Sequence, residues 1–349
     1  MENQAVREID HSPGIFKCQL LSGFEDARIS PAVWNELQRK GSGNVVFMTW
    51  HWQKTWWEVF GRGKLLLILA TANDKPIAVA PLFADEGMIF FVGSGGSDYL
   101  DFIGDISNVN HVKKILAFAV DQVKEFLGFR FYHIHESSAT IKILKAAAAD
   151  LGYQSFDEGS LGSPLLSMID FPENAMQATK KKSLLRHESW FNRNGGFKVL
   201  HLMKSNEILP WLHDFFDQHI SRWAHTDFPS LFLDEDQQNF YTALSEVADE
   251  TGWIQFTVLT WQQRAIAFHF GFNYHGSFLW YKPSFDITLA KYSPGEVLIR
   301  QLLLKAIADK MHQFDFGLGD EAFKNRFATS TCFVNTVGLY PASLIKNSL

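Results

Sequence analysis

Cysteine is scarce in this chain of 349 residues, which contains only Cys18 and Cys332. Two cysteines are too few for a disulfide framework or for a cysteine-based metal site. Their scarcity favours a reducing compartment, and the polar N-terminus lacks the apolar core of a signal peptide. We therefore expect a cytoplasmic protein.

The sequence also lacks a long apolar run and an excess of positive charge. No stretch approaches the roughly 20 apolar residues that a membrane-spanning helix needs, so we expect no transmembrane segment. The formal net charge is −6. This balance argues against general nucleic-acid binding, although it leaves room for a local basic patch.

Aromatic residues, in contrast, are abundant. They make up 15% of the chain, with 32 Phe and 11 Trp, while hydrophobic residues reach 46% and charged residues 20%. These proportions are typical of a globular protein, and the length allows two domains. Most of the rings are expected to fill cores, and some could line a groove.

The order of predicted elements repeats along the chain. Each half shows a hairpin, a third strand, a loop, a helix and a strand, at an offset of about 185 residues. Helix 111–127 corresponds to helix 295–311, and strand 129–134 corresponds to strand 312–317. We therefore predict an α+β (mixed α/β) fold of two tandem domains, each a mixed β-sheet flanked by helices. The predicted boundaries are a disordered tail at 1–14, an N-terminal domain at 15–172, a connecting helix at 173–196 and a C-terminal domain at 197–349.

The second helix of this repeat begins with a pattern that favours an anion. Ser293 is predicted as the N-cap, Pro294 fits the first helical position, and Gly295 allows a ligand to approach the backbone. The free N–H groups and the dipole of such a helix end attract phosphate. The same triplet could also mark nothing more than a helix start.

A charged segment follows the next strand, which carries Asp315. It contains Asp320, Glu321, Lys324 and Arg326. Lys324 and Arg326 could hold a phosphate or carboxylate of a ligand. Alternatively, they could form salt bridges with the acidic residues beside them.

These motifs, in this order, resemble those of the GNAT superfamily of acyltransferases. The closest likeness is to the bacterial acetyltransferases associated with cellulose and other exopolysaccharide biosynthesis, relatives of the Fem-type peptidoglycan transferases. The resemblance covers about residues 45 to 340, and Phe323 departs from it where the family often has Tyr. It is carried by Ser293-Pro294-Gly295, Asp315-Phe316-Gly317, Gly319-Asp320-Glu321, Phe323-Lys324, Arg326-Phe327-Ala328 and the N-terminal loop Gly93–Asp101.

The resemblance implies an acyltransferase that moves an acetyl or other acyl group from acetyl-CoA (acyl-CoA) by direct attack, without a covalent enzyme intermediate or a metal. The implied acceptor is an amine or hydroxyl of a sugar, a sugar nucleotide or another small molecule, and the enzyme could associate with polysaccharide-biosynthesis machinery. Two alternatives remain open at this point. One is a Fem-type transferase that uses aminoacyl-tRNA, and the other is a non-catalytic binding subunit of a polysaccharide-making complex.

Four residues are candidates for catalysis, and each has a structural alternative. Asp315 could orient an acceptor amine or bind backbone N–H groups, and Tyr281 could donate a proton or pack in the core. His269 could act as a base or be a buried, hydrogen-bonded histidine. Lys324 is the fourth candidate.

The remaining candidates bind ligands. The donor is expected to contact Ser293, Gly295, Glu296 and Arg326. The acceptor is expected to contact Asp98, Tyr99, Asp101, Asp286 and Asp320, although the first three could instead fix the interface between the halves. His133 and His135 share a strand face, but no third ligand lies nearby in the sequence, so we expect no metal site.

Overall fold

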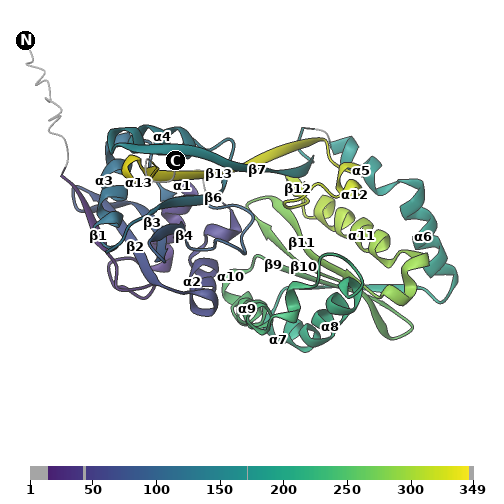
Figure 1. Cartoon of the computed structure of the whole chain (residues 1–349). Coiled ribbons are helices and arrows are strands. Elements are labelled where there is room, and N and C mark those ends of the chain that lie inside the picture. The colour runs from purple at the N-terminus through teal and green to yellow at the C-terminus, as the bar shows by residue number, and fades with distance from the viewer. Residues whose placement is uncertain (1–14, 42–44, 171, 346–349) are drawn as a thin grey trace, which may run out of the picture.

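The computed structural model describes residues 15–41, 45–170 and 172–345. Within these ranges the strands form one sheet of 13 strands with helices packed on its faces (Figure 1). This confirms the predicted mixed α/β fold. The predicted tail at 1–14 lies outside the described residues. None of the helices in the described ranges is long and apolar enough to cross a membrane.

In the N-terminal half, every strand except β7 ends by residue 135. In chain order its elements are β1 (Phe16–Leu20), α1 (Pro31–Lys40), η1 (Val46–Met48), α2 (Trp50–Phe60), β2 (Lys64–Ala72), β3 (Lys75–Asp85), β4 (Met88–Phe91), β5 (Ile103–Gly104), α3 (Val109–Val120), β6 (Gly128–His135), α4 (Thr140–Asp150) and β7 (Tyr153–Ser167).

The C-terminal half begins with helices. Its elements are α5 (Pro172–Thr179), α6 (Lys182–Arg193), β8 (Phe197–Leu202), α7 (Ser205–Ile208), η2 (Leu209–Trp211), α8 (Leu212–Trp223), η3 (Leu231–Leu233), α9 (Glu235–Glu246), α10 (Ala248–Thr251), β9 (Ile254–Trp261), β10 (Arg264–Tyr274), β11 (Ser277–Phe285), η4 (Ile287–Tyr292), α11 (Pro294–Ala308), β12 (Gln313–Asp315), α12 (Ala322–Asn325), β13 (Ser330–Pro341) and α13 (Ala342–Ile345).

The predicted repeat appears as the same strand connectivity in both halves. β2 pairs antiparallel with β3, and β3 pairs antiparallel with β4. β4 then pairs parallel with β6, and helix α3 lies in the crossover connection between these two strands. β9, β10 and β11 pair in the same way, and β11 pairs parallel with β12 after α11. Because a parallel pair requires a crossover connection, α3 and α11 each lie on a face of the sheet, over the strands of their own half.

The two halves exchange a strand in the middle of the sheet. β13, from the end of the chain, pairs antiparallel with β6 of the N-terminal half. β7, from the N-terminal half, pairs with β13 from Tyr153 to Leu165 and with β12 from Leu165 to Ser167. Figure 1 shows β7 and β13 running together from one half to the other. The sheet therefore continues from the N-terminal half into the C-terminal half, with no break at the predicted domain boundary at residue 172.

The sequence analysis did not predict β7. Its first part is polar and exposed, and Gly159, Gly162 and Pro164 interrupt any apolar alternation. Such a segment has weak intrinsic strand preference. It becomes a strand because β13 supplies hydrogen-bonding partners from Tyr153 to Leu165.

The predicted connecting helix at 173–196 is two helices rather than one. α5 ends at Thr179 and α6 begins at Lys182. Both pack against α11, and their buried residues belong to the same core cluster as Phe278, Trp280 and Phe314 of the C-terminal sheet. α5, α6 and α11 therefore cover one face of that sheet, while α8 and α9 pack on the other.

Helix α2 packs between the two halves of the chain. Trp52 is fully buried, and its indole N–H donates to Ser97 Oγ at 2.9 Å. Its ring lies 5.1 Å from Phe240 and 5.4 Å from Phe272, centroid to centroid, and both rings belong to the C-terminal half. The helix is thus part of the apolar contact between the halves.

We predict that Trp52→Ala lowers the free energy of unfolding by about 3–5 kcal/mol, because it removes a buried ring and leaves a cavity between the halves. Chemical denaturation measures this loss. Phe228→Ala, which removes a ring that is 75% exposed, is the control and should change stability by less than about 0.5 kcal/mol. A loss below about 1 kcal/mol for Trp52→Ala would show that this contact does not hold the halves together.

Candidate active site

The parallel strands β11 and β12 pair over only three residues. Ser277 pairs with Gln313 at the start of this ladder, and Leu279 pairs with Asp315 at its end. β11 continues to Phe285, whereas the chain after Asp315 leaves the sheet. The register between β10 and β11 also shifts between Phe270 and Phe272, which marks a bulge at this level of β11. The two strands therefore part beyond Leu279 and Asp315.

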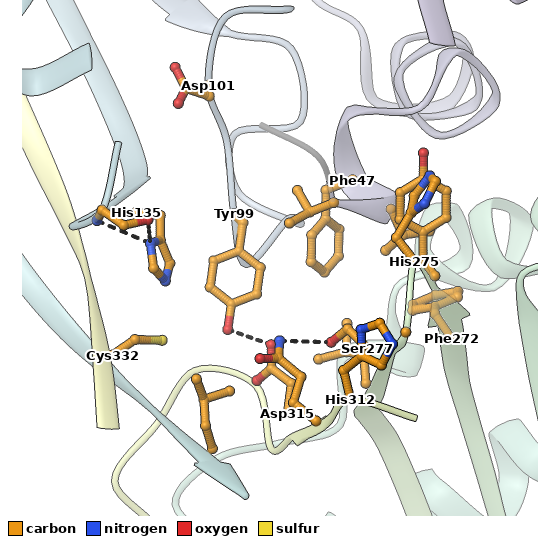
Figure 2. A pocket seen from close by; sticks show the side chains of 18 of the residues that line it. Phe47, Tyr99, Asp101, His135, Phe272, His275, Ser277, His312, Asp315 and Cys332 are labelled. Carbon is orange, nitrogen blue, oxygen red and sulfur yellow. Dashed lines mark hydrogen bonds between the residues drawn. The ribbon is translucent and has the colours of Figure 1, made fainter. Parts of the chain in front are cut away.

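A cavity of about 390 Å³ lies between the halves at the paired ends of β11 and β12, and we call it the interface cavity. Figure 2 shows Tyr99 pointing across it toward Asp315, with His135 and Cys332 on one side and Phe47, His275 and Phe272 on the other. Its lining includes Phe47, Tyr99, Asp101, His135, Phe272, Tyr274, His275, Ser277, Leu279, His312, Asp315 and Cys332.

Asp315 receives hydrogen bonds from three elements. The Tyr99 hydroxyl donates to its Oδ2 at 2.7 Å, and the Ser163 hydroxyl donates to its Oδ1 at 2.9 Å. The backbone N–H of Gly317 also donates to Oδ1, at 2.8 Å. Tyr99 belongs to the N-terminal loop, Ser163 to β7 and Asp315 to β12, so this carboxylate joins the two halves.

Burial sets the protonation of this group. Asp315 is 4% exposed. Loss of solvent raises its pKa from the ordinary 3.8 to about 6, although the three hydrogen bonds act in the opposite direction. The same burial raises the pKa of Tyr99 well above its usual value, so this hydroxyl stays protonated and donates.

A second cavity, of about 200 Å³, lies at the N-terminal end of α11, and we call it the helix-end cavity. Its lining includes Arg222, Trp280, Ser284, Phe285, Ser293, Gly295, Glu296, Phe323, Arg326 and Phe327. Leu279 borders the interface cavity and the next residue, Trp280, borders the helix-end cavity. The two cavities therefore approach opposite faces of the sheet where β11 and β12 part.

The start of α11 differs from the prediction in one respect. Pro294 occupies the first helical position as expected, but Ser293 has left-handed backbone angles, and its side chain makes no capping bond. Its hydroxyl faces the Ala290 carbonyl at 3.4 Å instead. At Gly295, an added Cβ would lie 3.2 Å from the Phe285 ring, so glycine keeps this part of the cavity open.

Polar groups surround the helix-end cavity. Arg326 donates to Glu296 Oε1 at 2.7 Å and to Ser183 Oγ at 2.8 Å. Arg222 donates to the Pro283 carbonyl at 2.9 Å, and burial lowers its pKa to about 10, so it remains charged near neutral pH. The Ser284 hydroxyl is fully buried and has no hydrogen-bond partner among the described residues. The N–H groups of Glu296 and Val297 donate to the Ser293 carbonyl, so a ligand in this cavity would meet cations, the backbone at Gly295 and an unpaired hydroxyl.

Comparison with known proteins agrees with this geometry. Residues 178–325 match the model of a family described as "Acetyltransferase (GNAT) domain". This part of the chain is therefore similar to a GNAT-type acetyltransferase domain. A search of curated protein sequences finds no match to the chain.

Solved structures share the fold over nearly the whole chain at low identity. FemX is 10% identical, with a TM-score of 0.64, and covers 91% of this chain and 98% of its own. L-PGS from Bacillus licheniformis is 15% identical, with a TM-score of 0.56, and covers 90% of this chain and 92% of its own. A tandem GNAT protein from the clavulanic acid biosynthesis pathway is 8% identical, with a TM-score of 0.51, and covers 93% and 98%. At these identities the likeness establishes the fold alone.

Several predicted site residues of the C-terminal half have structural partners. Buried Lys324 lines neither cavity and donates to the Leu318 carbonyl and to Glu321, each at 2.7 Å, so it fixes the loop between β12 and α12. Asp286 caps η4 through the N–H of Thr288 and pairs with Arg264 at 3.0 Å. Asp320 is exposed and lines neither cavity.

The candidates Tyr281 and His269 lie together inside the protein. The N–H of Tyr281 donates to His269 Nε2 at 3.2 Å, and the Tyr281 hydroxyl donates to the Gly96 carbonyl. His269 is fully buried, lines neither cavity, and burial lowers its pKa to about 3. This placement favours a structural role for His269 over that of a base, because its basicity is low.

The N-terminal loop contacts the C-terminal half through Asp98 and Tyr99. Asp98 accepts a hydrogen bond from the N–H of Leu318 at 3.1 Å. Asp101 also borders the interface cavity, but Ser138 and Thr140 each donate to its carboxylate at 2.6 Å, which ties the loop to the start of α4. Among the described residues, no group of three His, Cys, Asp or Glu side chains could hold a metal ion.

Sequence reasoning missed Ser163 and Arg222. Ser163 lies in the strand that was not predicted, and Arg222 lies on α8, far in sequence from the helix end that it reaches. Only the tertiary structure brings these residues to the site.

We predict that the stability difference between the wild type and Asp315→Asn depends on pH. In the folded protein, Asp315 ionises at about pH 6, above its ordinary pKa of 3.8. The stability that the protonated form provides is therefore complete below pH 3.8 and is lost as pH rises through 6. Because asparagine does not ionise, the wild type should lose about 2.4 kcal/mol relative to the variant between pH 4 and pH 8.

Chemical denaturation at both pH values measures this change. Asp320→Asn, in the same loop, controls for the removal of one exposed carboxylate. A wild-type-minus-variant difference that stays constant within about 1 kcal/mol would contradict the assigned pKa of Asp315.

Proposed function

We propose that the protein is an acyltransferase that uses acyl-CoA as donor. The observation that carries the proposal is the pair of cavities on opposite faces of the sheet where β11 and β12 part. A two-substrate transfer needs the donor and the acceptor to meet at one point from separate pockets. The GNAT domain match at residues 178–325 supports the same chemistry.

The donor occupies the helix-end cavity in this proposal. Its phosphates lie against the first turn of α11, where Gly295 leaves the backbone accessible and Arg326 adds positive charge. Glu296 neutralises part of that charge and holds the guanidinium in place. The Ser284 hydroxyl supplies one more hydrogen bond. The thioester then extends along β11 toward the opening between the strands.

The acceptor occupies the interface cavity. Its polar lining at the opening consists of Asp315 and the Tyr99 hydroxyl, with Ser277 and His312 farther along the strands. Above pH 6, Asp315 is a carboxylate that attracts and orients an acceptor amine. An amine or hydroxyl of a sugar or sugar nucleotide is the acceptor that the family resemblance implies, and a role beside polysaccharide-synthesis machinery would follow from it.

One alternative donor has an observation in its favour. Lys182, Arg186 and Arg193 are exposed on α6, and none of them forms a salt bridge with another described residue. Ser183 of the same helix binds Arg326, so this basic surface adjoins the helix-end cavity. A Fem-type transferase would use such a surface for aminoacyl-tRNA, and binding would then weaken steeply with salt.

We predict that Gly295→Val weakens acetyl-CoA binding at least about tenfold, because the larger side chain meets Phe285 and fills the space beside the first turn of α11. Isothermal titration calorimetry of the full chain measures the affinity. The control is Gly23→Val, since a Cβ at Gly23 has no atom within 4 Å.

Other results would refute the proposal. If the wild type does not bind acetyl-CoA at millimolar concentration, a non-catalytic binding subunit becomes the better account. If turnover requires RNA, is abolished by ribonuclease and falls steeply with salt, the aminoacyl-tRNA alternative replaces acyl-CoA.

A further inference from the structure

The interface cavity carries negative charge and lacks a cation in its lining. Asp101 and Asp315 border it, whereas no lysine or arginine is among the described residues that line it. Asp315 ionises at about pH 6, so it is a carboxylate at pH 7. Arg39 of α1 is close enough to act on Tyr274 and His275, but it is exposed and lies outside the lining.

Two further carboxylates act on the lining from outside it. The charge of Asp98 reinforces the effect of burial in raising the pKa of Asp315. Glu136, at the end of β6, opposes the effect of burial on the pKa of His135. Acidic groups from both halves of the chain therefore surround the cavity, and a bound anion would be repelled.

The buried imidazoles of the cavity add no positive charge. Burial lowers the pKa of His135 and of His275, so both rings are neutral at pH 7. The backbone N–H of Ser137 donates to His135 Nδ1 at 3.2 Å, which places the proton of the neutral ring on Nε2. His135 and His275 lie on opposite sides of the cavity (Figure 2). They are uncharged hydrogen-bonding groups that suit hydroxyls.

The rest of the lining combines aromatic rings with uncharged polar side chains. Phe47, Phe272 and Tyr274 present rings to the cavity, and Ser277 and Gln313 present a hydroxyl and an amide. The Gln313 amide donates to the Ser277 hydroxyl at 3.1 Å, which leaves the hydroxyl proton and the amide carbonyl for a ligand. A sugar ring has both an apolar face that packs on aromatic rings and hydroxyls that pair with such groups.

The size of the cavity limits what it holds. Its volume is about 390 Å³, near the lower end of the roughly 300–1,000 Å³ that small-molecule sites span. One sugar unit suits this space better than a sugar joined to a nucleotide.

We propose that the acceptor is an amino sugar that carries no phosphate, and that the charge of the interface cavity excludes sugar phosphates and sugar nucleotides. The amino group lies against Asp315, and the ring and its hydroxyls contact the aromatic and uncharged polar side chains. The inference rests on the proposed function, because it takes the molecule in the interface cavity to be the acceptor.

The test is isothermal titration calorimetry of the full chain at pH 7 with three probes, without an acyl donor. The probes are glucosamine, glucose, which lacks the amine, and glucosamine 6-phosphate, which adds the excluded group. Glucosamine should bind at least about tenfold more tightly than either of the others. Acetyl-CoA is titrated separately.

Two variants place the binding in the interface cavity. Asp315→Asn removes the negative charge, so glucosamine and glucose should then bind within about threefold of each other. Gln313→Lys adds a cation to the lining and should weaken glucosamine binding while it strengthens binding of the 6-phosphate, even if Asp315→Asn fails to fold. The control is Gln154→Lys, because Gln154 is exposed on β7 and lines neither cavity.

Three results would overturn the inference. They are glucosamine 6-phosphate binding as tightly as glucosamine, no binding of glucosamine at tens of millimolar, and a preference that Gln313→Lys leaves unchanged. If acetyl-CoA binds in any of these cases, the proposed donor survives and only the acceptor is wrong. If glucosamine binds with the expected preference but acetyl-CoA does not bind, the proposed donor fails while the charge selection of the cavity is upheld.

Discussion

The early end of the ladder between β11 and β12 is the constraint on which the site depends. A parallel pair that continued past Leu279 and Asp315 would satisfy its own backbone groups and close the sheet. Instead the chain after Asp315 turns away, and its N–H groups bond to β7, to Asp98 and to Asp315 itself. The sheet is thereby left open at one level, and a cavity approaches this level from each face.

The exchange of β7 and β13 explains why this opening stays fixed. β7 contributes Pro164 and Gly162 as acceptors for the turn and Ser163 as a donor to Asp315. Tyr99 reaches the same carboxylate from the N-terminal half. Because both halves contribute to one buried hydrogen-bonded cluster, the interface cavity forms only when they are assembled. A single copy of the repeat would lack it.

Local patterns in the sequence predicted the elements that depend on local information. The predicted helix 295–311 and strand 312–317 correspond to α11 (Pro294–Ala308) and β12 (Gln313–Asp315). β7 could not be predicted in this way, because its polar sequence becomes a strand only through pairing with β13. The side chain of Ser293 does not cap α11, because the residue follows η4 with left-handed backbone angles. The Ser-Pro-Gly triplet does not predict these angles.

The site was predictable only in part, because sequence motifs select single residues and do not give their contacts in the fold. Tyr99 and Asp315 were selected separately from motifs, and the fold brings them within 2.7 Å across 216 residues of chain. Lys324 was selected as a catalytic cation, but it is engaged with the loop that it stabilises.

The most direct test of the account is a crystal structure of the full chain with a thioether analogue of acetyl-CoA, which cannot transfer its acyl group. The account predicts the pyrophosphate at the first turn of α11 beside Gly295 and Arg326, and the acyl end between Tyr281 and Gly317. An analogue bound instead at the N-terminal loop Gly93–Ser97, with the helix-end cavity empty, would contradict it.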